Sequence, residues 1–441
     1  HQKAIRLRQV PEIDQLGSIS VRPSGRFLKF FGAGVLDQIL LSGANFISGF
    51  VMIRYTSDAS YGQFVLAQSA LLLLVSAQAA WLSGPVTIIA PAKTPERRAQ
   101  MIGALADSQT RFLRRLSGLL LLLPVATYLL GVWSPMVALG VAAGILAGWA
   151  SLQREYRRGV LLIYSRPQAM VRADVFYVAV LLLGIAIALT TRAYAGPVAI
   201  AALAAASLAG ALAARRMLAV DPGWVAGDAR PFWLEIRSLG VWSLVGAVIY
   251  WLFAQSYNYV LATRLNLTAV TNVNAARLVL TPVFVFMYGI NNLLMPLAAN
   301  WLAEIGIGRM LRRLALVAVL ITAIDLLYFA LAWYLRDWLI VDLMHKHIAD
   351  QDRLLLLWGC VALVFLPREV LQSVLYAFKR VRTMAWVIAI SAAVSLSLMW
   401  FGIPHWGAAA VLIGQVAGEC VNLVGLAILV WGYIPRRSAS A

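Results

Sequence analysis

Arg277 is a charged residue inside a long apolar stretch, and its surroundings give it the clearest chemical role in the sequence. A guanidinium stays charged at physiological pH, so within an apolar helix it requires a carboxylate or an anionic ligand nearby. At helical spacing, Arg277 shares a face with three polar residues: Thr281, Tyr288 and Asn291. Contact with an anionic substrate and a structural ion pair are both open for Arg277.

Polar side chains also recur at helical spacing on two other apolar stretches. They are Gln38 and Asn45 in the first stretch, and Tyr250, Tyr257 and the adjacent Asn258 in the seventh. Polar groups inside a membrane are costly, so such faces normally meet a partner helix or a watery cavity. Packing between helices explains any one of these residues. The simplest arrangement of all of them places their helices around a central cavity.

Four carboxylates inside apolar stretches are candidates for ion coupling, because each could bind a proton or a sodium ion: Asp37, Asp325, Glu369 and Glu419. Asp325 has no polar residue on its helix face, so we expect it to be neutral or paired with another helix. Glu369 follows Arg368, and neighbours on a helix point about 100° apart, so these two need not pair. No metal-ligand spacing or nucleotide-binding glycine loop accompanies the carboxylates, and no cofactor is expected.

Arg54 and Arg264 each stand at the end of an apolar stretch, and the segments after them are alike. In both, eight residues lead from the arginine to a residue suited to a turn, Gly62 or Asn272. The offset between the two segments is close to half the chain, which predicts two six-helix halves arranged as parallel repeats. The arginines either reach the membrane interface from helix ends or form a cationic rim for an exiting anion.

Apolar stretches long enough to span a membrane position all these residues. Twelve run along the chain, at about 31–53, 62–92, 117–133, 136–153, 174–191, 196–214, 239–262, 273–300, 314–335, 354–378, 384–401 and 407–432. Each suffices to cross a hydrocarbon core of about 30 Å. The sequence therefore predicts an all-α polytopic membrane protein, with about 12 transmembrane helices in two six-helix bundles around a central cavity. Its parts are an N-terminal tail, 1–30, a bundle, 31–215, a linker, 216–238, a second bundle, 239–432, and a C-terminal tail, 433–441.

Basic residues gather in every second gap between the stretches, and this indicates the orientation. Of the 37 Lys and Arg residues, only six lie in the other gaps: Arg54, Arg192, Arg264, Arg336, Lys346 and Arg353. Cytoplasmic loops collect Lys and Arg, so we expect both termini in the cytoplasm. The composition agrees with a membrane protein, since 13% of residues are charged, against about 25% in soluble proteins.

The composition also excludes several classes of function. The net charge of +18 is spread over alternate loops, which favours membrane lipids and an anionic substrate as partners and argues against nucleic acid. No segment between the stretches is long enough to bury a core of its own, which favours transport over an enzyme. His345, Lys346 and His347 resemble a metal cluster only superficially, and we expect them on a solvated loop.

Two segments carry a resemblance to a known family. Residues 42–46 (SGANF), followed by Arg54 and by 61–64 (YGQF), resemble the opening hairpin of bacterial polysaccharide flippases. Residues 276–282 (ARLVLTP) are similar to the eighth helix of that family. These proteins are the O-antigen and exopolysaccharide exporters of the multidrug/oligosaccharidyl-lipid/polysaccharide superfamily. The turn after Arg54 departs from the family's usual pattern, so the resemblance implies no binding role for that turn.

The resemblance implies a substrate and a mechanism. The substrate would be a polyprenyl-diphosphate-linked oligosaccharide, moved by alternating access from the cytoplasmic to the periplasmic leaflet of the bacterial inner membrane. Arg277 and Arg54 are the positions that match the family, and they would bind the diphosphate, while Asn, Gln and Tyr side chains would replace water around the sugar. The implied partners are a polysaccharide polymerase and chain-length machinery, and we expect the flippase itself to be a monomer.

Two other functions are open from the sequence. An ion-coupled multidrug exporter of the same superfamily would need acidic residues to dominate its cavity, and the first half offers Asp37 without a deep carboxylate cluster. A membrane-embedded polysaccharide polymerase would need a large outer loop rich in Arg and His, and the loop at 336–353 is small.

Overall fold

The computed structural model describes residues 25–218, 227–348, 350–378 and 380–433. Within these ranges the regular structure is helical and contains no strand, which confirms the predicted all-α class. Residues 1–24 and 434–441 of the predicted tails and residues 219–226 of the predicted linker lie outside the described residues. Residues 25–30, which were predicted as tail, belong to the first helix, so that helix begins earlier than predicted.

The helices of the first half are α1 (Gly25–Tyr55), α2 (Asp58–Gln78), η1 (Ala79–Ser83), α3 (Gly84–Ile89), η2 (Ala90–Ala92), α4 (Pro95–Leu129), α5 (Pro135–Ile163), α6 (Pro167–Thr190), η3 (Arg192–Tyr194) and α7 (Ala195–Leu218). Those of the second half are α8 (Arg230–Arg264), α9 (Leu267–Tyr334), η4 (Trp338–Leu343), α10 (Gln351–Ala377), α11 (Val381–Trp406) and α12 (Ala409–Tyr433). η1 and η4 are π-helical, whereas η2 and η3 are 3₁₀.

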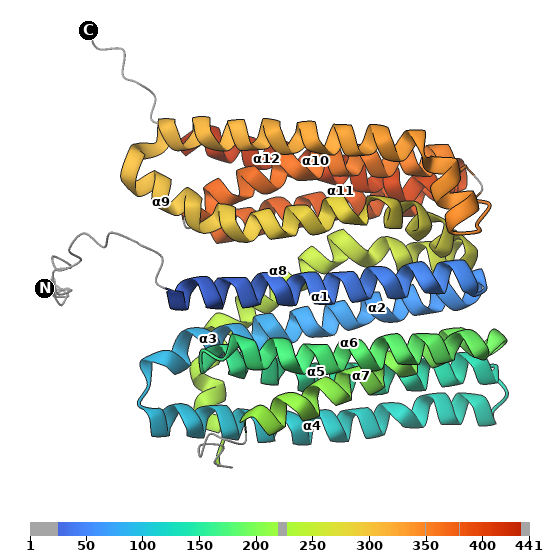
Figure 1. The fold of residues 1–441 in the computed structure, drawn as a ribbon, viewed down its shortest axis with the longest axis horizontal. Coiled ribbons are helices and arrows are strands. Elements are labelled where there is room, and N and C mark those ends of the chain that lie inside the picture. Colours follow the sequence, from blue (N-terminus) through green and yellow to red (C-terminus); the bar gives the residue numbers. More distant parts are fainter. Residues whose placement is uncertain (1–24, 219–226, 349, 379, 434–441) are drawn as a thin grey trace, which may run out of the picture.

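Eleven helices of the described chain are long and apolar enough to cross a membrane. The longest, α9, has non-helical backbone at Gly306, where φ is 76° and ψ is 168°. The chain reverses at this elbow, so α9 supplies two arms that lie side by side (Figure 1). We call them arm 9a (267–305) and arm 9b (307–334). Counted as arms, the helices agree with the twelve apolar stretches predicted.

Polar caps set where several helices begin. Four cap residues accept a hydrogen bond from the backbone N–H three residues later: Ser57, Thr94, Ser134 and Asn266. Such bonds satisfy N–H groups that the first helical turn leaves without a partner. Ser57 starts α2 shortly after Arg54, and Asn266 starts α9 shortly after Arg264. The two alike segments of the sequence therefore share one local structure, in which an arginine closes one helix and a polar cap opens the next.

The helices form two groups, with α8 between them. Figure 1 shows α1–α7 on one side, which we call the N group, and α9–α12 on the other, which we call the C group. Small residues permit close packing in each. A Cβ at Gly184 would lie 2.4 Å from the Cβ of Ala202, and one at Gly414 would lie 2.7 Å from the backbone oxygen of Ser395. Helices in a membrane associate through such close contacts, since lipid supplies no hydrophobic driving force between them.

Helix α8 packs on both groups. In its first half, the Trp233 ring stacks on Trp81 of the N group at 6.4 Å between centres, and Gly240 fits against the backbone of the same tryptophan. In its second half, Phe253 packs against Gly418 of the C group. One continuous helix thus connects the two groups.

The first turns of α8 occupy residues 230–238, which the sequence analysis assigned to the linker. Phe232 and Ile236 are buried one turn apart, whereas Glu235 and Arg237 are exposed. Because charged residues interrupt these turns, they do not form a continuous apolar stretch in the sequence. The predicted start of this helix at residue 239 is therefore too late.

The outside of the molecule is apolar. Leu119, Leu122 and Leu129 of α4 are 61–75% exposed, and Leu327 and Trp431 are both 75% exposed. Water would oppose so much exposed apolar surface, whereas lipid hydrocarbon accommodates it. The chain is therefore a multi-pass membrane protein.

Replacing Gly306 by alanine should destabilise the elbow of α9 by about 1–3 kcal/mol, because residues with a side chain rarely adopt this backbone conformation. Thermal unfolding of the detergent-solubilised protein, followed by tryptophan fluorescence, would measure the loss. Gly308→Ala is the matched control, since Gly308 is helical and has open space around it; alanine there should be neutral or slightly stabilising. Equal melting of the two variants would contradict the need for glycine at the elbow.

Candidate functional site

Arg277 lies on arm 9a, half-buried, and two aromatic side chains fix its position. Its Nη1 donates a hydrogen bond to the Tyr257 hydroxyl at 3.1 Å. Its guanidinium carbon lies 5.6 Å from the centre of the Trp358 ring, within the range of a cation–π interaction. Trp358 is itself anchored, because its Nε1 donates to the Val273 carbonyl at 2.9 Å. The cation is therefore held by α8, α9 and α10 together.

A chain of hydrogen bonds runs from Arg277 into the space between α8 and arm 9a. The Tyr257 hydroxyl donates to Oδ1 of Asn274 at 3.0 Å, and Nδ2 of Asn274 donates to Oδ1 of Asn258 at 2.7 Å. Nδ2 of Asn258 donates in turn to Oε1 of Gln255 at 3.4 Å. All these neutral members are buried, and buried polar groups of this kind are stable only when paired.

The same chain reaches the N group through Ser69 of α2. The Ser69 hydroxyl donates to Oε1 of Gln255 at 3.4 Å, and Nε1 of Trp251 donates to the Ser69 carbonyl at 2.8 Å. We call the connected residues the polar relay: Arg277, Tyr257, Asn274, Asn258, Gln255 and Ser69. Arg277, Tyr257 and Asn258 are among the residues predicted for the site, whereas Asn274 and Gln255 were missed. Asn258 and Asn274 lie at similar distances on either side of the α8–α9 turn, and this symmetry would have predicted their contact.

The other polar residues predicted on arm 9a have partners in different places. The Thr281 hydroxyl donates to the Arg277 carbonyl within its own helix at 3.3 Å. Asn291 donates to Glu369 of α10, so it belongs to the interior of the C group. The side chain of Tyr288 lies outside the described part of the chain. The predicted stripe is therefore not one continuous binding surface.

Helix α1 carries the two polar residues predicted for the first stretch. Gln38 and Asn45 are both exposed, and Nε2 of Gln38 donates to the Ser42 hydroxyl of the same helix at 3.0 Å. On α8, Tyr250 is half-buried. These three side chains lie outside the polar relay.

Asp37 lies in a buried ion cluster of the N group. Its carboxylate pairs with Arg158 at 2.6 Å. Asp174 pairs with Arg154 at 2.5 Å and with Arg158 at 2.8 Å, and Glu155 lies 2.7 Å from each of the two arginines. Helices α1, α5 and α6 thus bring three carboxylates and two guanidiniums together. The polar stripe of the first half was expected to carry Asp37 without a deep carboxylate cluster. The structure adds Asp174 and Glu155 from α6 and α5, which are not visible along the stripe of α1.

Glu369 and Glu419 flank one arginine in the C group. Arg368, which is fully buried, lies 2.7 Å from Glu369 and 2.7 Å from Glu419 of α12. Its Nη1 also donates to Gln372 at 2.9 Å. Arg368 and Glu369 were expected not to need each other. They do pair, since burial removes water as the alternative partner and long side chains span the angle between neighbouring positions.

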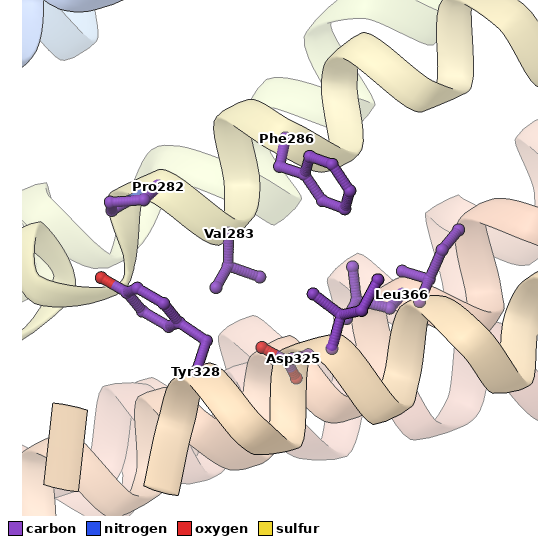
Figure 2. Close-up of a pocket in the computed structure, with 8 residues that line it drawn as sticks. Pro282, Val283, Phe286, Asp325, Tyr328 and Leu366 are labelled. Carbon is purple, nitrogen blue, oxygen red and sulfur yellow. The ribbon is translucent and has the colours of Figure 1, made fainter. Parts of the chain in front are cut away.

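Asp325 remains apart from the other ionisable groups. It is 4% exposed, and its Oδ1 has no hydrogen-bond partner among the described residues. It faces a small pocket between arms 9a and 9b (Figure 2). This agrees with the absence of polar companions on its own helix face, and no partner from another helix replaces them in the described chain.

Side chains of the two groups contact each other near the turn between α1 and α2, which we call the Arg54 end. Arg54 donates to the Leu343 carbonyl and lies 3.3 Å from Nε2 of His345. The Lys346 ammonium pairs with Asp58 at 2.6 Å. The loop with His345 and Lys346 is solvated as expected, since His345 and His347 are exposed. It also bridges to the N group, because its charges find partners on α1 and α2.

Two further contacts close the Arg54 end. The Thr271 hydroxyl of arm 9a donates to the Asp58 carbonyl at 2.8 Å. A Cβ at Gly62 would lie 2.9 Å from the Leu267 carbonyl, so glycine is needed for the backbones of α2 and α9 to approach. Arg264, at the same end, is exposed and lies 4.5 Å over the Trp400 ring of α11. Arg54 and Arg264 thus contact different helices.

Burial along α1 and arm 9a decreases toward the opposite end, which we call the tail end. Near the Arg54 end, Met52 and Ile53 of α1 are fully buried, as is Val273 of arm 9a. Toward the tail end the following are 40–62% exposed: Val35, Leu36 and Ile39 of α1, and Phe286, Leu293 and Leu297 of arm 9a. Contacts between the groups there run through α8, as in the Lys93–Glu235 ion pair at 2.7 Å. The described arrangement is closed at the Arg54 end.

Comparison with known proteins relates the chain to transporters by fold. No protein-family model matches it, and no curated protein matches it. A solved inward-facing multidrug resistance MATE family transporter of the MOP superfamily superimposes with a TM-score of 0.72 at 13% identity, over 90% of this chain and 95% of that one. The outward-facing conformation of such a transporter gives 0.61 at 11% identity, over 92% and 94%.

The lipid II flippase MurJ, in an inward closed conformation, gives a TM-score of 0.71 at 10% identity, over 92% of this chain and 87% of that one. The chain therefore has the fold of MOP superfamily transporters and flippases. These structural neighbours are transporters and a flippase, not enzymes, and the fold alone does not distinguish drug export from lipid flipping.

Asn274→Leu should destabilise the protein by about 2–4 kcal/mol, because it leaves Tyr257 and Asn258 buried without their partner. Chemical or thermal unfolding in detergent would measure this. Asn272→Leu is the control, since Asn272 is half-buried on the same arm and lies outside the polar relay; little change is expected. If both variants unfold alike, the relay does not contribute to stability.

Proposed function

We propose that this protein is a flippase for a polyprenyl-diphosphate-linked oligosaccharide, which it moves from the cytoplasmic to the periplasmic leaflet of the bacterial inner membrane. The observation that carries the proposal is Arg277, a permanent cation placed within the membrane-spanning fold and braced by Tyr257 and Trp358. A diphosphate cannot cross hydrocarbon unaided, because it would lose its hydration. A braced guanidinium replaces part of that hydration without having to reorganise.

The residues around Arg277 suit a headgroup that carries sugars beside a phosphate. We propose that Gln38 and Asn45, exposed on α1, and Tyr250 on α8 bind sugar hydroxyls. The polar relay would keep Tyr257 and Asn258 in place beside them. The polyprenyl tail would stay in lipid, outside the two groups. A polysaccharide polymerase and chain-length machinery would act on the delivered substrate, and we expect a monomeric flippase.

Alternating access is the mechanism we propose for the two groups. The closed Arg54 end and the greater exposure at the tail end support a state that loads from the tail side, which the basic loops place in the cytoplasm. The higher TM-score against the inward-facing transporter supports the same state. On opening, Arg54 would leave the Leu343 carbonyl and, with Arg264 at the same end, present cations to the departing diphosphate.

Coupling to a proton or sodium gradient is part of the proposal. In the N-group cluster, three carboxylates face two guanidiniums, so Asp37, Asp174 and Glu155 hold one negative charge in excess of their described partners. In the C group, Glu369 and Glu419 share Arg368 with the same excess. Buried unbalanced charge is unfavourable, so each cluster would bind a proton or a cation.

Export of cationic drugs is the second candidate function, and the structural comparisons support it equally. The specific observation in its favour is the acidic excess of the Asp37 cluster, since a cationic drug requires carboxylates. What argues against a cationic drug is the placement of those carboxylates, which are already paired with Arg154 and Arg158.

Arg277→Ala should lower flipping about 10- to 100-fold, because a hydrogen bond to a charged group contributes about 1.5–3 kcal/mol. Arg277→Lys should be intermediate, since lysine keeps the charge and loses the planar fork. The measurement is transfer of a fluorescent polyprenyl-diphosphate-linked oligosaccharide across proteoliposomes. Arg353→Ala, an exposed arginine at the start of α10, is the control and should flip normally. Normal flipping by the alanine variant of Arg277 at equal incorporation would refute the proposal.

Ethidium transport distinguishes the second function from the first. Proteoliposomes with the wild-type protein should not accumulate this cationic dye when a proton or sodium gradient is applied, because the cation on arm 9a repels it. Accumulation that is lost in Asp37→Asn, together with no flipping of the lipid-linked oligosaccharide, would assign drug export to the chain.

A further inference from the structure

A pocket of about 100 Å³ lies inside the C group, away from the polar relay. Figure 2 shows it between arm 9a, with Pro282, Val283 and Phe286, and arm 9b, with Asp325 and Tyr328. Its walls are apolar apart from the Asp325 carboxyl and the Tyr328 hydroxyl. The volume is enough for about three water molecules. Phe286, on the wall of the pocket, is 47% exposed, so the pocket is open on that side.

Asp325 is the group that gives this pocket a chemical role. Its carboxyl is more than nine-tenths buried and points into the pocket, and its Oδ1 has no hydrogen-bond partner among the described residues. A lone ionised carboxylate there would cost several kcal/mol or more. The three other coupling candidates, Asp37, Glu369 and Glu419, each pair with an arginine. Asp325 is the one of these four for which the described residues supply no cationic partner.

The titratable groups on the elements around the pocket leave Asp325 isolated. On arm 9b the facing group is Tyr328, whose hydroxyl donates to the Val279 carbonyl at 2.7 Å. On arm 9a the nearest cation along the helix is Arg277, which is braced by Tyr257 and Trp358. On α10 the pocket wall is Leu366, whereas Arg368 and Glu369 are engaged with each other.

The pocket adjoins the weakest point of arm 9a. Pro282 has no N–H and cannot bond to the carbonyl one turn before it, so the helix bends easily there. The Tyr328 hydroxyl bonds the Val279 carbonyl in this region and ties arm 9b to the bend. Arg277 precedes Pro282 on the same arm by little more than one helical turn. A change in the separation of the two arms at the pocket would therefore tilt the segment that carries Arg277.

We propose that Asp325 is a proton-binding site and that its protonation sets the bend of arm 9a. With the proton bound, the neutral carboxyl lets the arms close over a nearly dry pocket. When the proton leaves to water, the carboxylate draws water into the pocket, the arms separate at Pro282, and Arg277 shifts. This inference rests on the proposed function, because it names the coupling ion of the same flippase as H⁺ and gives the path from its site to the cation on arm 9a.

Labelling with dicyclohexylcarbodiimide tests the proton site without any substrate. This reagent enters from lipid and modifies protonated carboxyls in apolar surroundings. In the full-length protein in liposomes, Asp325 should be labelled at least about threefold faster at pH 6 than at pH 8, as read by peptide mass spectrometry. Asp107, which is partly exposed and pairs with Arg111, is the internal control and should react little. No labelling of Asp325, or labelling independent of pH, would overturn the proposal.

Hydrogen–deuterium exchange tests the link to arm 9a. After correction for intrinsic rates, peptides covering 278–290 should exchange faster at pH 8 than at pH 6 in the wild type. Asp325→Asn, which has the shape of the neutral acid and cannot ionise, should lose this difference, while Asp107→Asn should keep it. A pH difference that persists in Asp325→Asn would overturn the link.

Flipping in proteoliposomes completes the test. Asp325→Asn should remove the acceleration of wild-type flipping by a pH gradient, and retention of the full acceleration would overturn the proposal. Should the wild type flip no lipid-linked oligosaccharide although Asp325 labels and exchanges as expected, the proposed substrate fails and the proton site stands. Should Asp325→Asn be poorly folded, Asp325→Leu provides a second permanently neutral variant for the same measurements.

Discussion

Charge inside hydrocarbon must be compensated, and this requirement organises the whole molecule. The chain places ionisable groups where hydration is lost, so every one of them requires a partner, a proton or a ligand. The N group meets the requirement with the network of Asp37, Arg158 and their neighbours, and the C group with Arg368 between two glutamates. Arg277 is held differently, by a tyrosine hydroxyl and the face of a tryptophan. Asp37 and Arg368 are therefore held in ion pairs, whereas the contacts described for Arg277 are with neutral aromatic side chains.

The fold could be predicted from the sequence in its main features. Apolar length fixes the number of spans, and the alike segments after Arg54 and Arg264 correctly indicated the same helix–cap–helix structure in both halves. The gap between the eighth and ninth stretches predicted the reversal within α9, but not that Gly306 makes it. The start of α8 was placed too late because Phe232 and Ile236 bury only one face of its first turns. Amphipathic turns at a membrane surface have no continuous apolar run to reveal them.

The candidate site could be predicted only in part. Arg277 and Tyr257 were identified because charge and helical spacing are visible along one chain segment. Asn274 and Gln255 were missed, because their roles depend on which helices meet, and that is set by packing between segments. For the same reason the partners of Asp37 were not foreseen: Arg158 lies far along the chain from it, on α5. The isolation of Asp325, by contrast, followed from its own helix face, since a residue without polar neighbours in sequence also found none among the described helices.

The double attachment of α8 limits how the two groups can move. Its first turns contact the N group through Trp233 and Glu235. Its last half contacts both groups, the C group through Phe253 and Arg264 and α2 of the N group through Trp251 and Tyr259. Between these attachments lies Gly246, which has open space where a side chain would be. A continuous helix resists stretching but flexes. Under the alternating access proposed above, the groups would therefore rock about α8 more readily than slide past each other, and the stiffness of its central turns would set how fast the open side changes.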